Sequence, residues 1–311
     1  MSASTDIRSV SPAARAAGPW LVLAAAIVWS FGGLLARLAD VGDPWVVIAW
    51  RTAVATACIA AFLLLRDGRA GTAAMARAMG WPGVAVGACF AIAMTSFVVA
   101  LQYTTVANIL LIQAGEPLIA ALAARILLGE AFGWRTGAAT AAVVLGIAIM
   151  VSESFGDGGS MAGNLLALAI SVSFAAATVI TRRHAEIRMT PAVGLGTTIA
   201  CVAAVAAGMA QGSDFSLDAW QFSMLALFGG SLGLGLALFA AGARAVPSAI
   251  AALLGVAEVV LGPVWVWLAL GETPSARAAL GGGIVLAALL AHLGWQLLEQ
   301  RRERGALPAA Y

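Results

Sequence analysis

Two stretches of this sequence share one design. Residues 116–130 read EPLIAALAARILLGE, and residues 258–272 read EVVLGPVWVWLALGE. Each is an apolar run that begins with a glutamate and ends with a Gly-Glu pair, and the spacing is the same in both (130 − 116 = 14 and 272 − 258 = 14). An offset of 142 residues also aligns Arg135 with Arg277. The chain is therefore a duplicated unit with an acidic residue at the same place in each copy.

The composition places most of this chain in lipid. Of its 311 residues, 62% are hydrophobic and only 10% are charged, and the mean hydropathy is +0.96. A soluble domain carries about 25% charged residues, so the composition excludes a soluble enzyme or receptor module. A helix needs about 20 apolar residues to cross a bilayer. We predict an all-α integral membrane protein with ten transmembrane helices, at 19–39, 45–65, 82–101, 107–128, 135–152, 163–181, 191–210, 220–241, 249–270 and 279–298.

The arginines predict how the chain crosses the membrane. All 17 basic residues are arginine, and cationic residues in short loops accumulate on the cytoplasmic side. With a cytoplasmic N-terminus, 14 of the 17 arginines fall in cytoplasmic segments. The outer loops then hold only Arg37 and Arg277. We therefore predict a multi-pass protein with both termini in the cytoplasm.

Duplication of five helices predicts two inverted repeats. Five is an odd number, so the second copy enters the membrane from the opposite side, as in many secondary transporters. The register is supported by Trp29–Phe31 against Val172–Phe174 (offset 143) and by Pro44 against Pro191 (offset 147). The predicted segments are a cytoplasmic tail at 1–17, a first repeat at 18–152, a periplasmic linker at 153–162, a second repeat at 163–298 and a cytoplasmic tail at 299–311.

The glutamates that begin the two runs are the foremost functional candidates. Glu116 and Glu258 lie near the middle of their predicted helices, where an ionised acid costs several kcal/mol and therefore faces a partner or a wet cavity. We expect both to face a substrate cavity, where they are candidates for proton coupling. The alternative is a protonated acid that hydrogen-bonds a neighbouring helix. Pro117 and Pro263 are expected to kink these helices, and such kinks often lie at cavities.

Polar and aromatic residues within the spans suggest an amphiphilic cavity. Glu258 and Trp265 share a helix face at i and i+7, and such a face suits a molecule with a cationic amine and an apolar body. Each polar residue on its own is also explained by a helix–helix hydrogen bond, and Trp265 by the aromatic belt at the membrane surface. The further cavity candidates are Trp29, Ser30, Thr95, Ser96, Gln102, Tyr103, Asn108, Gln113, Ser173, Ser231 and Trp265.

Arg51 and the glycines of the eighth span receive structural interpretations. Arg51 lies about two turns inside the second span, and we expect it to snorkel to the outer surface or pair with a nearby acid rather than bind a substrate carboxylate. Gly229, Gly233 and Ala237 are spaced at i, i+4 and i+8. Such small residues allow close helix packing. The alternative is a smooth face along which helices slide.

A short motif raises one alternative from another class, an intramembrane serine protease. Residues 229–233 read GGSLG and fit G-x-S-x-G, with Ser231 and His292 at similar predicted depths. The usual setting of that motif is a strand-to-helix turn, and here it lies inside a glycine-rich membrane helix. The repeat and the lack of a third, orienting group also argue against proteolysis, so we predict that the protein is not an enzyme.

No cofactor, metal ion or nucleic acid is predicted as a partner. His184 and His292 are far apart in the sequence, and no phosphate-binding loop or dinucleotide motif occurs. Cys58, Cys89 and Cys201 fall inside predicted spans and are interpreted as small packing residues. The net charge of +2 arises from arginines spread along one membrane face, which do not form a nucleic-acid patch. The expected partners are the lipid bilayer and a small-molecule substrate.

Together these residues resemble a known family. Ten helices in two repeats, Trp29-Ser30 near the middle of the first span, Glu116-Pro117 and the Gly-Glu pairs at 129–130 and 271–272 are similar to the EamA family of the drug/metabolite transporter superfamily, over about 18–298. The resemblance implies export of small metabolites across a bacterial inner membrane, through a central cavity between the halves. Members of this size include amino-acid exporters, among them YddG-type exporters of aromatic amino acids.

The two halves depart from one another at the prolines. The second half has Val259 where the first has Pro117, and Pro263 where the first has Ala121, so the halves need not bend alike. We predict an inner-membrane exporter of amino acids, most of all aromatic or other apolar ones, that works by alternating access. Export of other amphiphilic metabolites or drugs is the alternative. The spans expected around the cavity are 19–39, 82–101, 107–128, 163–181, 220–241 and 249–270.

Overall fold

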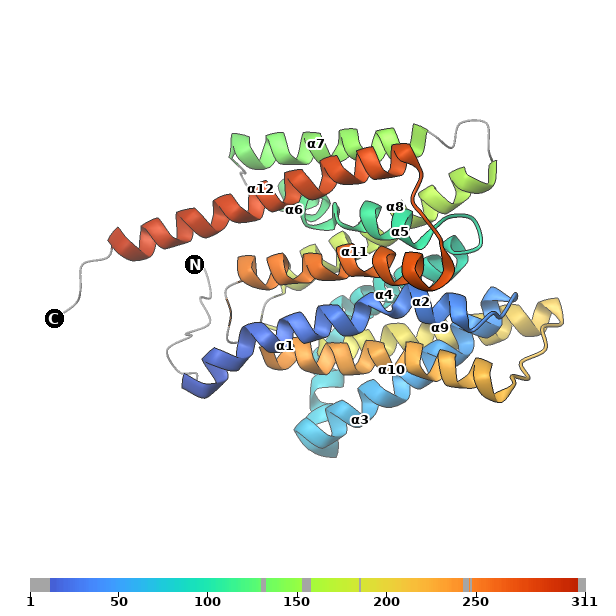
Figure 1. Ribbon diagram of the computed structural model, residues 1–311. Helices are drawn as coiled ribbons and strands as arrows, with labels where there is room; N and C mark the ends of the chain where they lie inside the picture. The colour runs from blue at the N-terminus through green and yellow to red at the C-terminus, as the bar shows by residue number, and fades with distance from the viewer. Residues whose placement is uncertain are drawn as a thin grey trace.

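The computed structural model describes residues 12–129, 133–152, 158–184, 186–242, 246 and 248–306, and every regular element in these ranges is a helix (Figure 1). The first repeat contains α1 (Pro12–Ser30), α2 (Gly32–Leu38), α3 (Pro44–Ala78), α4 (Gly80–Ala100), α5 (Val106–Gln113), α6 (Glu116–Leu128) and α7 (Trp134–Ser152). The second repeat contains α8 (Gly158–Arg183), α9 (Thr190–Gln211), α10 (Ala219–Gly242), α11 (Ser248–Leu270) and α12 (Ala276–Ala306).

Most of these helices suit a bilayer by length and composition. Within the described ranges, nine helical segments are long and apolar enough to cross a membrane, and Leu254–Leu270 of α11 is a shorter apolar helix. Two of the nine consist of a pair of helices, α1 with α2 and α5 with α6. The predicted all-α membrane architecture is therefore confirmed, with two of its ten spans interrupted.

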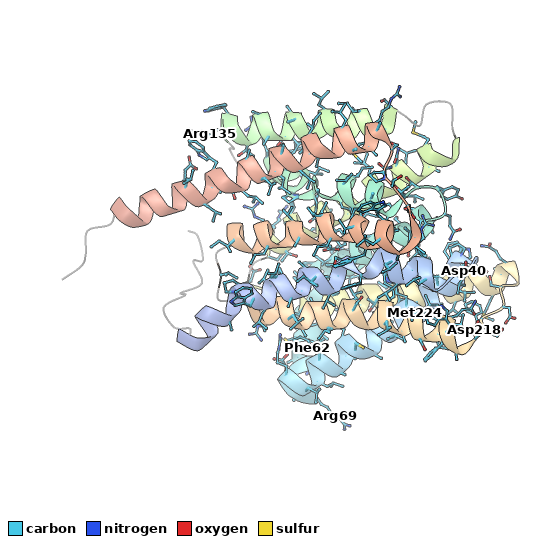
Figure 2. The ribbon with its side chains drawn as sticks, in the orientation of Figure 1. Asp40, Phe62, Arg69, Arg135, Asp218 and Met224 are labelled. Atoms are coloured by element: carbon cyan, nitrogen blue, oxygen red, sulfur yellow. The ribbon has the colours of Figure 1, made fainter. Side chains whose placement is uncertain are left out.

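The helices run side by side, so the molecule has two ends. In Figure 1, α1 (blue) begins and α12 (red) ends on the left, and we call this end the terminal side. The connections after α2, α4, α9 and α11 lie on the right, which we call the distal side. Figure 2 shows Asp40 and Asp218 at the distal side and Arg135 at the terminal side.

The packing is reciprocal between the two repeats. Helix α4, the third span of the first repeat, packs against α8 and α9, the first and second spans of the second repeat. In return α10, the third span of the second repeat, packs against α1 and α3. The contact of α1 with α11 is likewise matched by that of α8 with α5 and α6, and α7 packs against its counterpart α12. This exchange of partners is what a two-fold relation between inverted repeats requires.

Local sequence signals set several helix starts. Asp43 caps α3 by accepting a hydrogen bond from the Trp45 amide at 2.8 Å, with Pro44 in the first turn. Pro191 occupies the first turn of α9, the counterpart of α3. Thr105 caps α5 by accepting from the Asn108 amide at 3.1 Å. Polar residues at these points end the connecting turns and start the next span.

Glycines let the helices approach closely. A Cβ atom at Gly146 of α7 would lie 2.6 Å from the Gly281 carbonyl oxygen of α12, so these backbones touch. On α10, a Cβ atom at Gly229 would lie 2.9 Å from the Val54 Cβ atom, and one at Gly233 would lie 2.5 Å from the Cys58 Cβ atom. Helix α10 therefore packs through its glycines directly on α3, in keeping with the packing interpretation of this spacing.

Candidate functional site

A cavity of about 400 Å³ lies between the two repeats. Its walls come from α1 to α6 of the first repeat and from α8, α10, α11 and α12 of the second. Helices α3 and α12 thus join the spans that were expected to surround it. The lining is largely aliphatic and aromatic, with Arg51, Glu116 and Glu258 as the charged residues that face the cavity from the described part of the chain.

The two glutamates that begin the duplicated runs both line this cavity. Helix α5 ends at Gln113 and α6 begins at Glu116, with Pro117 in its first turn. The helix of this span is interrupted between Gln113 and Glu116, and Glu116 lies at the positive end of the α6 dipole. Glu258 lies instead inside α11, which continues through Pro263. The two halves are therefore built differently around the two acids that line the cavity.

The position of the Arg51 side chain contradicts the expectation that this residue snorkels to the surface or pairs with an acid. Its side chain is 8% exposed and faces the cavity, with the guanidinium carbon 3.9 Å from the centre of the Phe228 ring and 5.5 Å from that of Phe97. Its Nε and Nη1 atoms have no hydrogen-bond partner, and no ion pair to it is found among the described residues. The short distance from the start of α3 suggested snorkelling, but packing of α3 on α10 turns this residue inward.

An aromatic wall is the part of the site that the sequence interpretation missed. Phe90, Met94 and Phe97 line the cavity from one face of α4, at i, i+4 and i+7. Phe174 of α8 meets Phe90 edge to face, with ring centroids 5.5 Å apart. Helical spacing of these residues was a usable signal, but apolar side chains also cover the lipid-facing sides of such helices, so spacing alone does not single out a cavity face.

Three further cavity candidates line the cavity as well, namely Trp29, Gln113 and Ser231. Among the described residues, the indole Nε1 of Trp29 and the side-chain oxygen of Gln113 have no hydrogen-bond partner. The Trp29 Nε1 atom packs against Gly235 of α10, whereas Gln113 and Arg51 bring polar groups without a partner to the cavity lining. Buried polar groups are almost always paired, so this set is suited to a polar ligand.

Ser30, Trp265 and Asn108 lie in contacts between the repeats instead of in the cavity lining. The Trp265 indole donates a hydrogen bond to the Ser30 hydroxyl at 2.9 Å and stacks on Phe31 at a centroid distance of 5.0 Å. The Asn108 amide group donates to the Asn164 side chain of α8. These contacts join α1 to α11 and α5 to α8, so their polar groups hold the repeats together.

The remaining candidates also lie away from the lining. Ser96 and Ser173 are buried in α4 and α8, which pack on each other, and Thr95 is half-buried beside Ser96. Gln102 and Tyr103 are exposed in the turn after α4. The sequence interpretation named all five as cavity residues, and the structure places none of them in the cavity lining. Glu130, the end marker of the first duplicated run, lies outside the described residues.

Ser231 and His292 do not meet in the arrangement that a serine protease needs. The Ser231 hydroxyl donates to the carbonyl of Phe228, one turn earlier, at 2.8 Å. The His292 ring bonds to Gln296, one turn later, at 3.0 Å. Each group is thus engaged within its own helix, and a base must instead bond the nucleophile.

The cavity extends toward the terminal side. A second pocket of about 280 Å³ shares Phe90, Glu116 and Phe174 with the cavity and continues along α8 to Thr181 and Arg182. On the distal side, the contacts of Trp265 with Ser30 and Phe31 close the space between α1 and α11. The site therefore has the form of a central chamber that leads toward one end of the molecule.

Comparisons with known proteins agree with this architecture. A solved crystal structure is similar to this protein, and the matched region covers 89% of this chain and 96% of the other. The TM-score is 0.63 and the sequence identity is 18%, so the likeness is one of fold. No curated protein matches the chain in sequence. The sequence profile of the EamA-like transporter family, however, matches twice, over residues 16–152 and 161–293. Two copies of the profile fall on the two inverted repeats, and the protein therefore belongs to the EamA-like transporter family, a group of membrane transporters.

Proposed function

We propose that this protein exports amphiphilic amino acids, aromatic or otherwise bulky and apolar, from the cytoplasm across a bacterial inner membrane. The observation that carries the proposal is the placement of Glu116 and Glu258 in one aromatic-lined cavity between the repeats. A cavity of about 400 Å³ falls within the range of 300–1,000 Å³ typical of small-molecule sites. An acid pair suits a cationic amine, and the Phe90–Phe174 wall suits an apolar side chain.

Alternating access is the proposed mechanism. The chamber continues along α8 to the terminal side, while contacts between the repeats close the distal side. A change to a closed terminal side and an open distal side would carry a solute across. Such a change suits this fold because the inverted repeats pack reciprocally and can exchange their arrangements. Transport then consists of opening the distal contacts and closing the terminal ones around the occupied cavity.

The arginines orient this movement in the cell. Of the 17 arginines, 14 belong to segments on the terminal side by the predicted topology, and positive loops stay in the cytoplasm. The terminal side is therefore proposed to be cytoplasmic and the distal side periplasmic. In that orientation the chamber opens to the cytoplasm, where a solute destined for export would enter.

Transport by purified protein tests the proposal. Proteoliposomes loaded with unlabelled phenylalanine should take up labelled phenylalanine faster than protein-free liposomes, and a panel of labelled solutes should show preference for aromatic and large aliphatic amino acids. The protein-free liposomes serve as the control for non-specific leak, and Glu116→Gln with Glu258→Gln together should lower uptake because the amine then lacks its acid pair. Transport of other amphiphilic metabolites but of no amino acid would reject the substrate assignment while leaving the transporter family intact.

A further inference from the structure

Arg51 is a buried cation that the proposed recognition of an amine does not use. It is 8% exposed, faces the cavity, and has two guanidinium nitrogens without a hydrogen-bond partner. A buried charge is strongly unfavourable unless it is paired. Among the described residues, the groups that face its guanidinium are the aromatic rings of Phe97 and Phe228. Arg51 is therefore a cationic group of the cavity lining with no acidic partner among the described residues.

The surroundings of Arg51 hold its guanidinium in place. The guanidinium carbon lies 3.9 Å from the centre of the Phe228 ring, and that ring is packed in turn against Gly32, where a Cβ atom would lie 3.1 Å from the Phe228 Cε2 atom. The Arg51 backbone is also fixed, because its carbonyl oxygen touches α10 at Gly229. The ring covers one side of the guanidinium, and the group has no hydrogen-bond or ion-pair partner in the described part of the chain. The paired N–H groups of a guanidinium match the two oxygens of a carboxylate.

The acids and Arg51 lie at different depths. Arg51 is 7 residues after the start of α3 at Pro44 (51 − 44), about 10 Å from the distal end of that helix. Glu258 is 12 residues before the end of α11 at Leu270 (270 − 258), about 18 Å from its distal end. The cavity thus has a cationic pole toward the distal side and an anionic pole nearer the middle.

We propose that Arg51 binds the carboxylate of the transported solute, so that the site selects molecules that carry both an anionic and a cationic group. This inference rests on the proposed amino-acid transport and specifies the orientation of the solute. The solute carboxylate binds Arg51 toward the distal side, and the ammonium lies toward Glu116 and Glu258. The apolar side chain lies against the aromatic wall. Amines without a carboxylate leave Arg51 unpaired and are rejected.

Competition in counterflow measures this selectivity. Uptake of labelled phenylalanine into proteoliposomes is inhibited with unlabelled phenylalanine, phenylalaninamide, phenethylamine and 3-phenylpropionate. In the wild type, loss of the carboxylate should weaken competition about 10- to 100-fold, the effect of removing a hydrogen-bonded charge partner. In Arg51→Met, the concentration of phenylalanine that halves uptake should rise by a similar factor. The corresponding concentration of phenylalaninamide should stay within about twofold of its wild-type value.

Two variants serve as matched comparisons. Arg66 also stacks on a phenylalanine, 5.1 Å from the centre of the Phe62 ring, but it lies outside the cavity lining and pairs with Asp67 at 2.8 Å. Arg66→Met should keep the wild-type ratio between the half-inhibitory concentrations of phenylalanine and phenylalaninamide. Arg51→Lys should fall between wild type and Arg51→Met, because an ammonium keeps the charge without the planar fork.

The outcomes separate this inference from the proposed function. Transport of amino acids with an unchanged ratio in Arg51→Met overturns the role of Arg51 alone. If no amino acid moves but binding of 3-phenylpropionate, measured as thermal stabilisation of the purified protein, depends on Arg51, the carboxylate site stands and the amino-acid proposal fails. Should Arg51→Met not fold, the wild-type series decides, since equal competition by phenylalanine and phenylalaninamide rejects the site. Failure of both phenylalanine and 3-phenylpropionate to bind rejects it as well.

Discussion

Arg37 and Glu272 form an ion pair between the two repeats at the distal side, with the Arg37 Nε atom 3.2 Å from the Glu272 Oε2 atom. The Arg37 guanidinium also donates to the carbonyl oxygens of Leu101 and Thr104, at 2.8 and 3.0 Å. Glu272 accepts from the Val106 amide at 2.8 Å. This pair ties α2 and the start of α5 to the segment after α11, so the proposed opening of the distal side requires that it break.

Loss of this pair should favour the distally open state. Glu272→Gln should raise labelling of a cavity reporter, Ser231→Cys in a cysteine-free background, by an impermeant maleimide in intact cells. A rise of roughly fivefold is expected, because a partly exposed pair contributes on the order of 1 kcal/mol. Arg66→Met removes an ion pair within α3 and keeps the contact of Asp67 with Arg188, so it should leave labelling unchanged. Equal labelling of Glu272→Gln and the parent would refute a gating role.

The acid pair should couple transport to protons. Two ionised carboxylates in one cavity repel each other, so the pair favours a cation between them, either the solute ammonium or a proton that replaces it. Glu116→Gln and Glu258→Gln should each abolish accumulation driven by an imposed pH gradient. Counterflow at equal pH should fall by no more than about tenfold, since the amide keeps the shape and hydrogen-bonding capacity of the acid. Gradient-driven accumulation that persists in both variants would leave the acids a binding role only.

Removal of the Arg51 charge should stabilise the protein. Arg51→Met removes an unpaired buried cation, and methionine can still pack on the Phe228 ring. We expect the free energy of unfolding to rise by on the order of 1–3 kcal/mol, seen as a higher apparent Tm in detergent. Arg37→Met should lower the Tm, because that cation is paired with Glu272 and bonded to two carbonyls. A lower Tm for Arg51→Met would show that Arg51 is structural.

The contact of α7 with α12 should tolerate no added side chain. Gly146→Ala would place a Cβ atom 2.6 Å from the Gly281 carbonyl oxygen and 2.8 Å from the Val285 Cγ2 atom, which should destabilise the protein by about 1–3 kcal/mol. Gly283 lies on the same helix as Gly281, and a Cβ atom added there would meet no other atom within 4 Å, so Gly283→Ala is the matched control. It should be neutral or stabilising by up to about 1 kcal/mol, through helix propensity. Thermal unfolding in detergent distinguishes the two.

Hydropathy and internal repetition were enough to predict the ten spans, their two inverted repeats and the equivalence of Glu116 and Glu258. A helix that crosses the bilayer needs a run of about 20 apolar residues, and such a run can be recognised from a short window of the sequence. The predicted spans at 45–65 and 191–210 begin within one residue of α3 at Pro44 and of α9 at Thr190. Depth in the membrane follows directly from such runs, so both acids were placed near the middle of their helices.

Which face of each helix meets the cavity depended on the tertiary structure. Ser30 and Trp265 are polar and aromatic residues of the kind expected in a cavity, but they bond to each other across the repeats. Arg51, expected to snorkel to the outer surface or to pair with an acid, instead faces the cavity beside the Phe228 ring. In lipid, apolar side chains suit the outside of a bundle as well as its interior, so hydrophobic periodicity does not define a helix's rotation. That rotation is set by close contacts between distant segments, such as Gly229 of α10 against Arg51 of α3, and these contacts exist only once the two repeats have packed.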